Sequence, residues 1–163
     1  SFVVEPKFGI VLNNEMDDFT ALPGVPNAFG LLQSEANSIA PGKRPLSSMT
    51  PTIVVREGKA QFVVGASGGP RIITATAQVL LRMNKFHQSA TDAVNAPRIH
   101  HQWSPDFLDF EKELQSLTPA LEAWGHKPRP RVGGAAVQAC RRLENGRVEG
   151  ASDRRKGGLP AGY

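Results

Sequence analysis

The chain has 163 residues, of which 40% are hydrophobic and 21% are charged. These proportions exclude an intrinsically disordered chain, and the length suits a single domain, residues 1–163, with its own core. No apolar run approaches the roughly 20 residues that cross a bilayer, and residues 1–6 (SFVVEP) lack the basic and apolar regions of a signal peptide, so we expect neither here. A single cysteine, Cys140, excludes an intrachain disulfide.

The net charge of +4 arises mainly in the last quarter of the chain, where nine Lys or Arg follow position 126 against three acidic residues. A basic tail is compatible with nucleic acid, but Tyr163 is the only aromatic residue in this stretch, so it offers no stacking platform for single strands. We therefore expect no nucleic-acid binding and favour a solvated face or a contact with a partner subunit.

The first half of the chain predicts one strand, one long loop and one hairpin. Residues 8–12 (FGIVL) are typical of a short buried strand that runs into a polar turn. Residues 20–49 contain several prolines and glycines with little periodicity, which indicates a functional loop or lid. Two β-branched runs, 52–56 and 60–64, flank a turn at 57–59 that contains a glycine, and this pattern predicts a hairpin.

The second half predicts helices between strands. Pro70 suits a first helical turn, and apolar or small residues follow it at helical spacing, namely Ile72, Thr76, Val79, Leu80 and Met83. Ser89 followed by Asp92 resembles a capping box, and Thr118-Pro119 opens a further helix that Gly125 closes. Strands at 135–142 and 147–150 flank Asn145-Gly146, a strong hairpin signal. The elements together favour an α+β fold with mainly antiparallel strands.

Residues 13–19 read NNEMDDF and place two adjacent carboxylates, Asp17 and Asp18, after the predicted strand. Such a pair can hold a metal ion or a substrate ammonium group. No histidine lies nearby and the next acidic residue is Glu35, so a metal site is poorly supported. The alternative is an acidic turn or a helix cap.

Residues 43–49 read KRPLSSM and place two hydroxyl groups, Ser47 and Ser48, beside two cations. This combination suits an anionic group such as a carboxylate. The alternative is a turn in which the serines bond to their own backbone.

Residues 65–71 read GASGGPR, a glycine pair between a predicted strand and a predicted helix. The N–H groups of Gly68 and Gly69 then point out at the positive end of the helix, which suits a phosphate, a carboxylate or a developing oxyanion. The stretch also resembles the GxSxG nucleophile elbow loosely, with Ser67 in third place, but no Ser…Asp…His order with βαβ alternation accompanies it.

Residues 95–103 read NAPRIHHQW and contain neighbouring histidines, His100 and His101. Adjacent residues of a strand point to opposite sides, so packing and hydrogen bonding are favoured over a metal site, and we expect no metal and no cofactor.

These stretches, taken together and in order, resemble the γ-glutamyltransferase family. The resemblance is carried by NNEMDDF (13–19), PGVPN (23–27), KRPLSSMTPT (43–52), GGPRI (68–72), NAPR with HHQ (95–102), and GASD before AGY (150–163). It implies an N-terminal-nucleophile hydrolase fold, a four-layer αββα sandwich, of which this chain supplies the greater part of the small subunit.

The resemblance also implies residue roles. Asp18 corresponds to the carboxylate that binds the substrate α-ammonium group, and Glu15 assists it. Ser47 and Ser48 correspond to hydroxyls that hold the α-carboxylate, and Gly68 and Gly69 to the amide donors of the oxyanion hole. Residues 23–32 correspond to a lid loop, with Phe29 where relatives place an aromatic wall residue.

The main departure from the family pattern lies at the front of the chain, while at the far end Arg154 stands where relatives often have proline. The family's small subunit begins with a catalytic threonine in a Thr-Thr/Ser-His sequence, whereas this chain begins Ser1-Phe2-Val3. An N-terminal hydroxyl can be activated by its own α-amine, but Ser1 corresponds to a position inside the family's subunit. We therefore expect the nucleophile to lie outside this chain, in the N-terminal part of the same precursor.

The resemblance predicts γ-glutamyl transfer or hydrolysis on glutathione and related compounds, with a large subunit as partner and an amino acid or peptide as acceptor. It also implies a periplasmic or extracellular location. Two alternatives stay open: a paralogue acting on cephalosporin side chains or poly-γ-glutamate, and a non-catalytic partner-binding domain that uses the basic tail.

Overall fold

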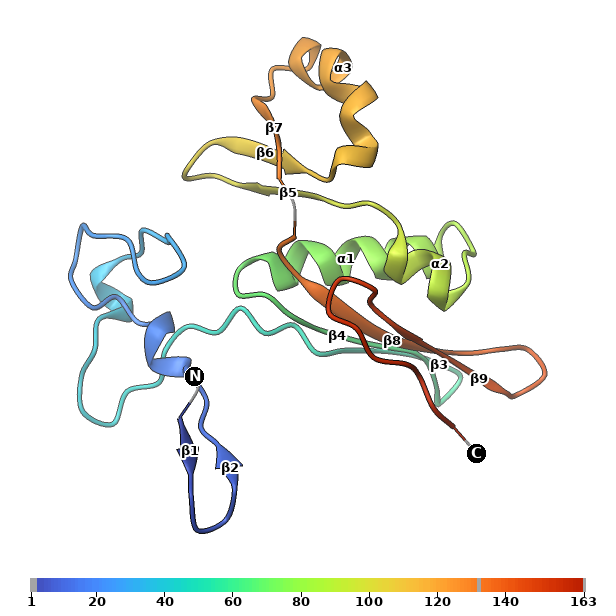
Figure 1. Ribbon diagram of the computed structural model, residues 1–163, viewed down its shortest axis with the longest axis horizontal. Coiled ribbons are helices and arrows are strands. Elements are labelled where there is room, and N and C mark those ends of the chain that lie inside the picture. The colour runs from blue at the N-terminus through green and yellow to red at the C-terminus, as the bar shows by residue number, and fades with distance from the viewer. Residues whose placement is uncertain (1–2, 132, 163) are drawn as a thin grey trace. The chain divides into compact units, whose positions relative to one another are not determined.

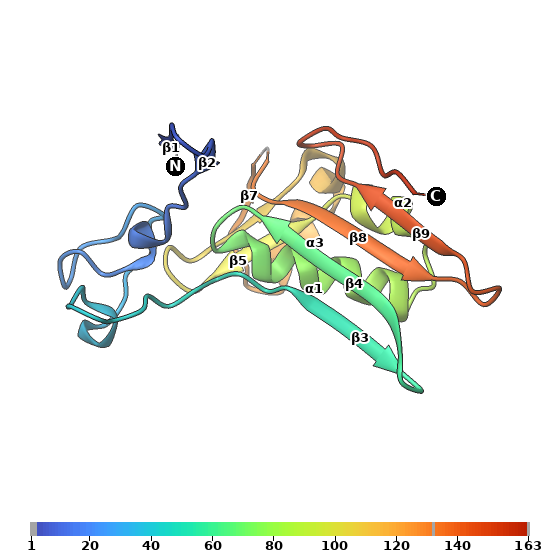
Figure 2. The same cartoon turned by 90° about the horizontal axis from the view of Figure 1, so that it is seen from below.

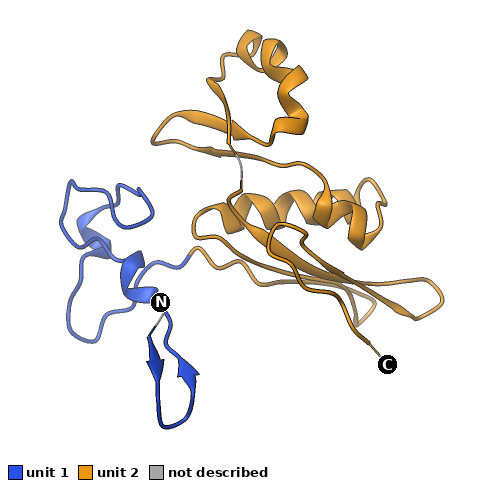
Figure 3. Cartoon of the chain, in the orientation of Figure 1, with its two compact units in different colours: residues 1–47 blue, residues 48–163 orange. Residues whose placement is uncertain are grey.

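The computed structural model describes residues 3–131 and 133–162, which form two compact units, residues 1–47 and 48–163 (Figure 3). The expectation of a single domain over 1–163 stays a prediction. Ser1 lies outside the described residues, so the expectation about its role stays a prediction as well.

The first unit opens with a small antiparallel hairpin of β1 (Val4–Glu5) and β2 (Ile10–Val11). The strand expected at 8–12 is present only as Ile10–Val11, and the expectation that it is buried is wrong, because both residues are exposed. The Glu5 carboxylate accepts hydrogen bonds from the amides of Lys7 and Phe8 at 3.1 and 2.8 Å, so the chain turns at Phe8 instead of extending. Within the described part of this unit no layer covers the two-stranded ribbon, and its apolar residues are exposed, including Phe8, Ile10 and Val11.

The rest of the first unit is largely irregular, as expected. It contains two short 3₁₀ helices, η1 (Glu15–Asp18) and η2 (Glu35–Asn37), and a single bridge between Thr20 and Ser38. Phe19 and Thr20 are buried and form the centre of this unit. The role of residues 20–49 as a lid stays a prediction.

The second unit is built on a four-stranded antiparallel sheet of order β3-β4-β8-β9 (Figure 1). Its strands are β3 (Thr52–Arg56), β4 (Lys59–Ser67), β8 (Ala136–Arg142) and β9 (Val148–Ser152). Both predicted hairpins are confirmed. The β3–β4 turn consists of Glu57 and Gly58, both at positive φ (52° and 72°), the backbone that a tight two-residue hairpin turn requires.

Two helices, α1 (Arg71–Asn84) and α2 (Ala90–Asn95), cover one face of this sheet (Figures 1 and 2). The apolar stripe predicted for α1 is confirmed, because its buried residues pack on the inward residues of β4 and β8. The Ser89 hydroxyl accepts a hydrogen bond from the Asp92 amide at 3.0 Å, which confirms the predicted helix start. The core comprises chiefly Val64, Val79, Met83, Val94 and Val137.

The opposite face of the sheet is open over β3, where Ile53, Val55 and the neighbouring Val63 of β4 are exposed. Over β9 the C-terminal segment lies against it: a Cβ placed on Gly150 would be 3.2 Å from Pro160, and one placed on Gly158 would be 3.4 Å from the Ser152 hydroxyl. This unit therefore supplies one sheet layer and one helix layer of the expected sandwich.

A second, three-stranded sheet of order β5-β6-β7 was not predicted from the sequence. Strands β5 (Ile99–Gln102) and β6 (Phe107–Phe110) are antiparallel, and β7 (Pro128–Pro130) is parallel to β6. Between β6 and β7 lie η3 (Lys112–Leu117) and α3 (Thr118–Ala123), with the predicted Thr118-Pro119 start and Gly125 end. None of the described helices is long and apolar enough to span a bilayer.

Candidate functional site

The predicted ammonium-binding residues, Glu15 and Asp18, lie at the two ends of η1. One helical turn separates them, so their half-buried carboxylates fall on the same side and interact directly. Asp17 lies between them and is exposed. The structure thus brings together the two residues that the resemblance pairs and turns their neighbour toward solvent.

The environment raises the pKa of Asp18. Partial burial is the largest cause, followed by the negative charges of Glu15 and Asp17 and a hydrogen bond with Glu15. A carboxylate that is crowded by other carboxylates gains most from an added cation, because the cation relieves both desolvation and repulsion. This electrostatic setting suits an ammonium group.

Phe29, the predicted wall residue, is half-buried and lies in a turn. Asn27 builds this turn, because its side-chain Oδ1 accepts hydrogen bonds from the amides of Phe29 and Leu31, both at 3.0 Å. Asn27 was not predicted to have a role, although asparagine bonding to the backbone two residues ahead is a known turn signal.

Asn37 is a second structural residue that sequence reasoning missed. Its Nδ2 donates to the backbone carbonyl of Asp18 at 2.8 Å, and its Oδ1 accepts from the amide of Leu46 at 2.8 Å. Its own carbonyl accepts from the Thr20 amide at 3.0 Å. One side chain therefore connects the η1 segment with the residue that precedes the Ser47-Ser48 pair.

Ser47 is exposed and Ser48 is half-buried. They fall at the boundary between the two units, Ser47 in the first and Ser48 in the second. The backbone after them is held by hydroxyl groups, since Thr50 Oγ1 donates to the carbonyl of Ser48 at 3.0 Å and Thr52 Oγ1 to that of Thr50 at 2.9 Å. The segment enters β3 directly, so a strand of the sheet fixes it at one end.

The predicted oxyanion donors, Gly68 and Gly69, lie between the end of β4 and the start of α1, as expected from the sequence. Both have positive φ values, 141° and 57°. Their carbonyls accept the amides of Arg71 and Ile72 at 3.3 and 3.0 Å, so the pair precedes the first hydrogen bonds of the helix. Amide groups ahead of a helix have no helical acceptor and point toward an incoming anion.

Two residues at the end of β4, Ser67 and Gly68, are contacted by segments from the C-terminal half of the chain. A Cβ on Gly68 would lie 2.6 Å from Cα of Ala135, so no larger residue fits there without movement of the backbone. On the preceding residue, Ser67, the hydroxyl accepts a hydrogen bond from Lys156 Nζ at 2.9 Å. Lys156 belongs to the turn after β9, so this turn contacts the residue that precedes the glycine pair.

The motif residues Arg98 and Asp153 form a buried ion pair to which the sequence analysis gave no role. Arg98 Nη2 lies 2.5 Å from Asp153 Oδ2, and Asp153 is 0% exposed. Burial alone raises the pKa of Asp153, but hydrogen bonds from Arg98, Val137 and Arg155 outweigh it, so the pKa is lowered. A charged residue in each of two motif segments is the signal that would have indicated this pair.

The neighbouring histidines point to opposite sides of β5. The ring of His100 bonds to Thr74 Oγ1 at 2.8 Å, and the ring of His101 to Asp106 at 3.1 Å. Burial, and then the charge of Arg71, lower the pKa of His100. Among the described residues no three His, Cys, Asp or Glu side chains come together as a metal site.

The second unit is an α+β unit with a glycine pair ahead of its main helix, and the same chain carries the carboxylate and serine pairs on which the family resemblance rests. The model of the γ-glutamyltranspeptidase family matches residues 1–163, and the chain belongs to this family.

Two solved structures confirm the predicted fold. The γ-glutamyltranspeptidase of Pseudomonas nitroreducens, complexed with L-DON, has a TM-score of 0.85 at 40% identity over 99% of this chain and 86% of that one. A mutant γ-glutamyltranspeptidase of Helicobacter pylori has a TM-score of 0.85 at 40% identity, covering 94% of this chain and 85% of that one. The α+β, N-terminal-nucleophile hydrolase fold that the resemblance implies is thus that of this chain.

Curated relatives are longer than this chain. The glutathione hydrolase proenzyme of Escherichia coli K12 is 46% identical over 163 residues, which cover 99% of this chain and 28% of the relative. The corresponding proenzyme of Pseudomonas sp. A14 is also 46% identical, with 95% and 29% covered. The chain therefore spans less than a third of the length of these relatives.

Proposed function

We propose that this chain acts in the hydrolysis and transfer of γ-glutamyl groups from glutathione and related compounds. Membership of the γ-glutamyltranspeptidase family over residues 1–163 is the observation that carries the proposal. Relatives named as glutathione hydrolase proenzymes support glutathione as the substrate class.

We propose that this chain binds the glutamyl head group of the substrate. Its α-ammonium group binds the carboxylate of Asp18, assisted by Glu15. Its α-carboxylate accepts hydrogen bonds from Ser47 and Ser48, which suit it because hydroxyl groups donate to an anion without adding a competing charge. Phe29 covers the head group from the lid loop.

The reacting carbonyl is placed at the glycine pair. As the nucleophile attacks, the carbonyl oxygen becomes an oxyanion, and the amides of Gly68 and Gly69 stabilise it by donating hydrogen bonds. Such donors act mainly in the transition state, because the charge that they stabilise is absent from the bound substrate. The attacking threonine hydroxyl of the family has no counterpart among the residues assigned here, and we place it in the N-terminal part of the same precursor.

The proposal includes a large subunit as partner, since the relatives are named as proenzymes and the family resemblance implies cleavage into two subunits. It also includes an amino acid or peptide acceptor for the transfer reaction, and a periplasmic or extracellular location. The exposed apolar residues of β3 favour such a partner, because an uncovered apolar sheet face is costly in water.

The test is turnover by the assembled two-subunit enzyme. We expect release of p-nitroaniline from γ-glutamyl-p-nitroanilide, with the α-glutamyl isomer as a matched control that should be inert. Addition of glycylglycine should raise the rate if transfer competes with hydrolysis. Preference for a glutaryl cephalosporin or for poly-γ-glutamate over glutathione would overturn the substrate assignment, and retention of the chain on nucleic acid with no turnover would favour the non-catalytic alternative.

A further inference from the structure

Asp109 is a buried carboxylate outside the residues assigned above, at the centre of the small sheet on β6. It is 4% exposed, and three arginines surround it. Arg71 Nη2 donates to it, Arg129 Nε donates at 2.7 Å, and Arg131 Nη1 lies 3.6 Å away. Burial alone raises the pKa of Asp109, but hydrogen bonds from Arg129 and Arg71 outweigh it and the pKa is lowered, so the group is ionised at neutral pH.

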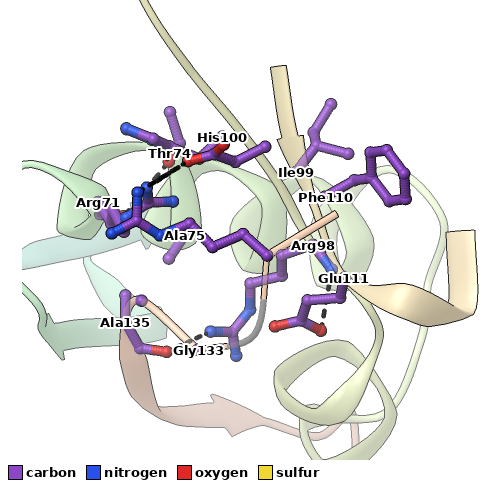
Figure 4. Close-up of a pocket in the computed structure, with 13 residues that line it drawn as sticks. Arg71, Thr74, Ala75, Arg98, Ile99, His100, Phe110, Glu111, Gly133 and Ala135 are labelled. Carbon is purple, nitrogen blue, oxygen red and sulfur yellow. Dashed lines mark hydrogen bonds and ion pairs between the residues drawn. The ribbon is translucent and has the colours of Figure 1, made fainter. Parts of the chain in front are cut away.

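Arg71 connects this carboxylate to the oxyanion loop. It is the first residue of α1, two positions after Gly69, and its amide already bonds to the carbonyl of Gly68. Its side chain extends from the helix start into the pocket shown in Figure 4. Asp109 receives the guanidinium there, so the direction of this side chain is fixed by a charged hydrogen bond between α1 and the three-stranded sheet.

The aliphatic part of the Arg71 side chain in turn packs against the backbone of Gly134, which contacts Gly68. A Cβ placed on Gly134 would lie 2.6 Å from Arg71 Cδ, so the backbone of Gly134 and the stem of Arg71 are in close contact. On its other side, Gly134 and the following Ala135 pack directly against Gly68. Asp109, Arg71, Gly134 and Gly68 therefore form one continuous stack.

We propose that Asp109 is a positioning residue for the oxyanion hole: it holds Arg71 against Gly134, and Gly134 fixes the backbone of Gly68. This inference rests on the proposed function for its catalytic consequence, while the packing that it describes is independent of any substrate.

Loss of the carboxylate acts locally, because α1 has other attachments to β5. Gln78 bonds to both the amide and the carbonyl of Ile99 at 3.1 and 2.8 Å, and Thr74 bonds to His100. Without the charge of Asp109, Arg71 faces Arg129 and Arg131 unopposed and turns toward solvent. Gly134 then loses its neighbour, and the glycine pair loses its fixed geometry while the helix stays in place.

The experiment compares Asp109→Asn with Arg129→Gln in the assembled enzyme. Arg129 is a second partner of the same carboxylate, and Arg71, not Arg129, is the side chain that lies against Gly134, so loss of Arg129 is the matched control. We expect Asp109→Asn to lower kcat for γ-glutamyl-p-nitroanilide at least tenfold with KM within twofold, and to weaken binding of a tetrahedral γ-boronate analogue in parallel. Arg129→Gln should keep kcat within about threefold.

A second readout needs no substrate. Hydrogen–deuterium exchange in peptides covering residues 65–72 should rise in Asp109→Asn and stay unchanged in Arg129→Gln. Asp109→Glu retains the charge, so it should recover part of kcat and of the protection, and it replaces Asp109→Asn if that variant fails to fold. If hydrogen–deuterium exchange at residues 65–72 is unchanged in Asp109→Asn, the proposal is wrong. It is also wrong if the Tm of this variant falls while its kcat and its affinity for the boronate stay the same. A wild-type enzyme without γ-glutamyl turnover would refute the proposed function and leave the exchange test decisive.

Discussion

Asp18 combines a half-buried position with a carboxylate neighbour, and both matter for its proposed contact with an ammonium group. Asp18→Asn removes the charge and keeps the shape. A charge-assisted hydrogen bond contributes about 1.5–3 kcal/mol, so we expect kcat/KM to fall roughly 10- to 150-fold, chiefly through KM. Steady-state kinetics with γ-glutamyl-p-nitroanilide measure this, and an unchanged kcat/KM would remove Asp18 from the site.

The raised pKa of Asp18 predicts a pH dependence. The carboxylate must be ionised to bind an ammonium group, so kcat/KM falls on the acid side as Asp18 takes up a proton, at a higher pH than for an isolated aspartate. Glu15→Gln removes a neighbouring negative charge that contributes to the shift. Its acid limb should therefore move to lower pH, and a limb that stays in place or moves upward contradicts the assignment.

Two of the hydrogen bonds of the Asn37 side chain, those with the Asp18 carbonyl and the Leu46 amide, can be separated by a pair of variants. Asn37→Ala removes both the bond to the Asp18 carbonyl and the bond from the Leu46 amide, about 1–3 kcal/mol in total. Asn37→Asp keeps an acceptor for Leu46 and loses the donor to Asp18. We expect KM to rise in both, more in Asn37→Ala, with smaller changes in kcat. Equal KM values for all three proteins would show that the two segments hold their geometry without Asn37.

At the scale of elements, the start of α1 combines a strand end, a glycine pair and a helix N-terminus. Gly69 has φ of 57°, where a β-branched residue is strained. Gly69→Val should lower kcat about 10²- to 10³-fold, since misplacing an oxyanion donor raises the transition-state energy more than the ground-state energy. Gly69→Asn is the control, because asparagine tolerates this backbone and should retain more of kcat. A change in KM alone would assign the pair to ground-state binding.

The elements that depend on local signals were predictable from the sequence. The α1 stripe, the Ser89 start and the Asn145-Gly146 hairpin each carry their pattern within a few residues. The β5-β6-β7 sheet does not: its strands have three or four residues, β7 begins and ends with proline, and β7 pairs in parallel with β6 across η3 and α3. The residues of the candidate site differ in the same way. The glycine pair has a local sequence signal and was predicted, whereas the contacts of Asn37 and Asp109 are with residues distant in sequence and were not.

For the molecule as a whole, the exposed apolar residues of β3 predict that the chain by itself is unstable. Because the nucleophile is expected outside this chain, we also expect the isolated chain to be inactive. Expressed alone, residues 1–163 should bind a hydrophobic dye such as ANS, associate with themselves and show no measurable turnover of γ-glutamyl-p-nitroanilide. Co-expression with the rest of the proenzyme should abolish dye binding. Turnover by the isolated chain within about tenfold of the assembled enzyme would place a nucleophile among these residues, with Ser1 and Ser67 to be replaced first.

The C-terminal segment on the open sheet face gives the protein a reporter of its own. Cys140, the only cysteine of the chain, lies on β8 in a hollow lined also by Pro160 and Ala161. Cys140 is exposed while the segment is in place, so a thiol-reactive fluorophore can be attached there without unfolding the chain, and its emission should report whether Pro160 and Ala161 lie beside it. We expect Lys156→Ala, which removes the bond to Ser67, to shift this emission, and Lys156→Arg to restore it. An emission that is the same in all three proteins would show that the Lys156 contact does not hold the segment on the sheet.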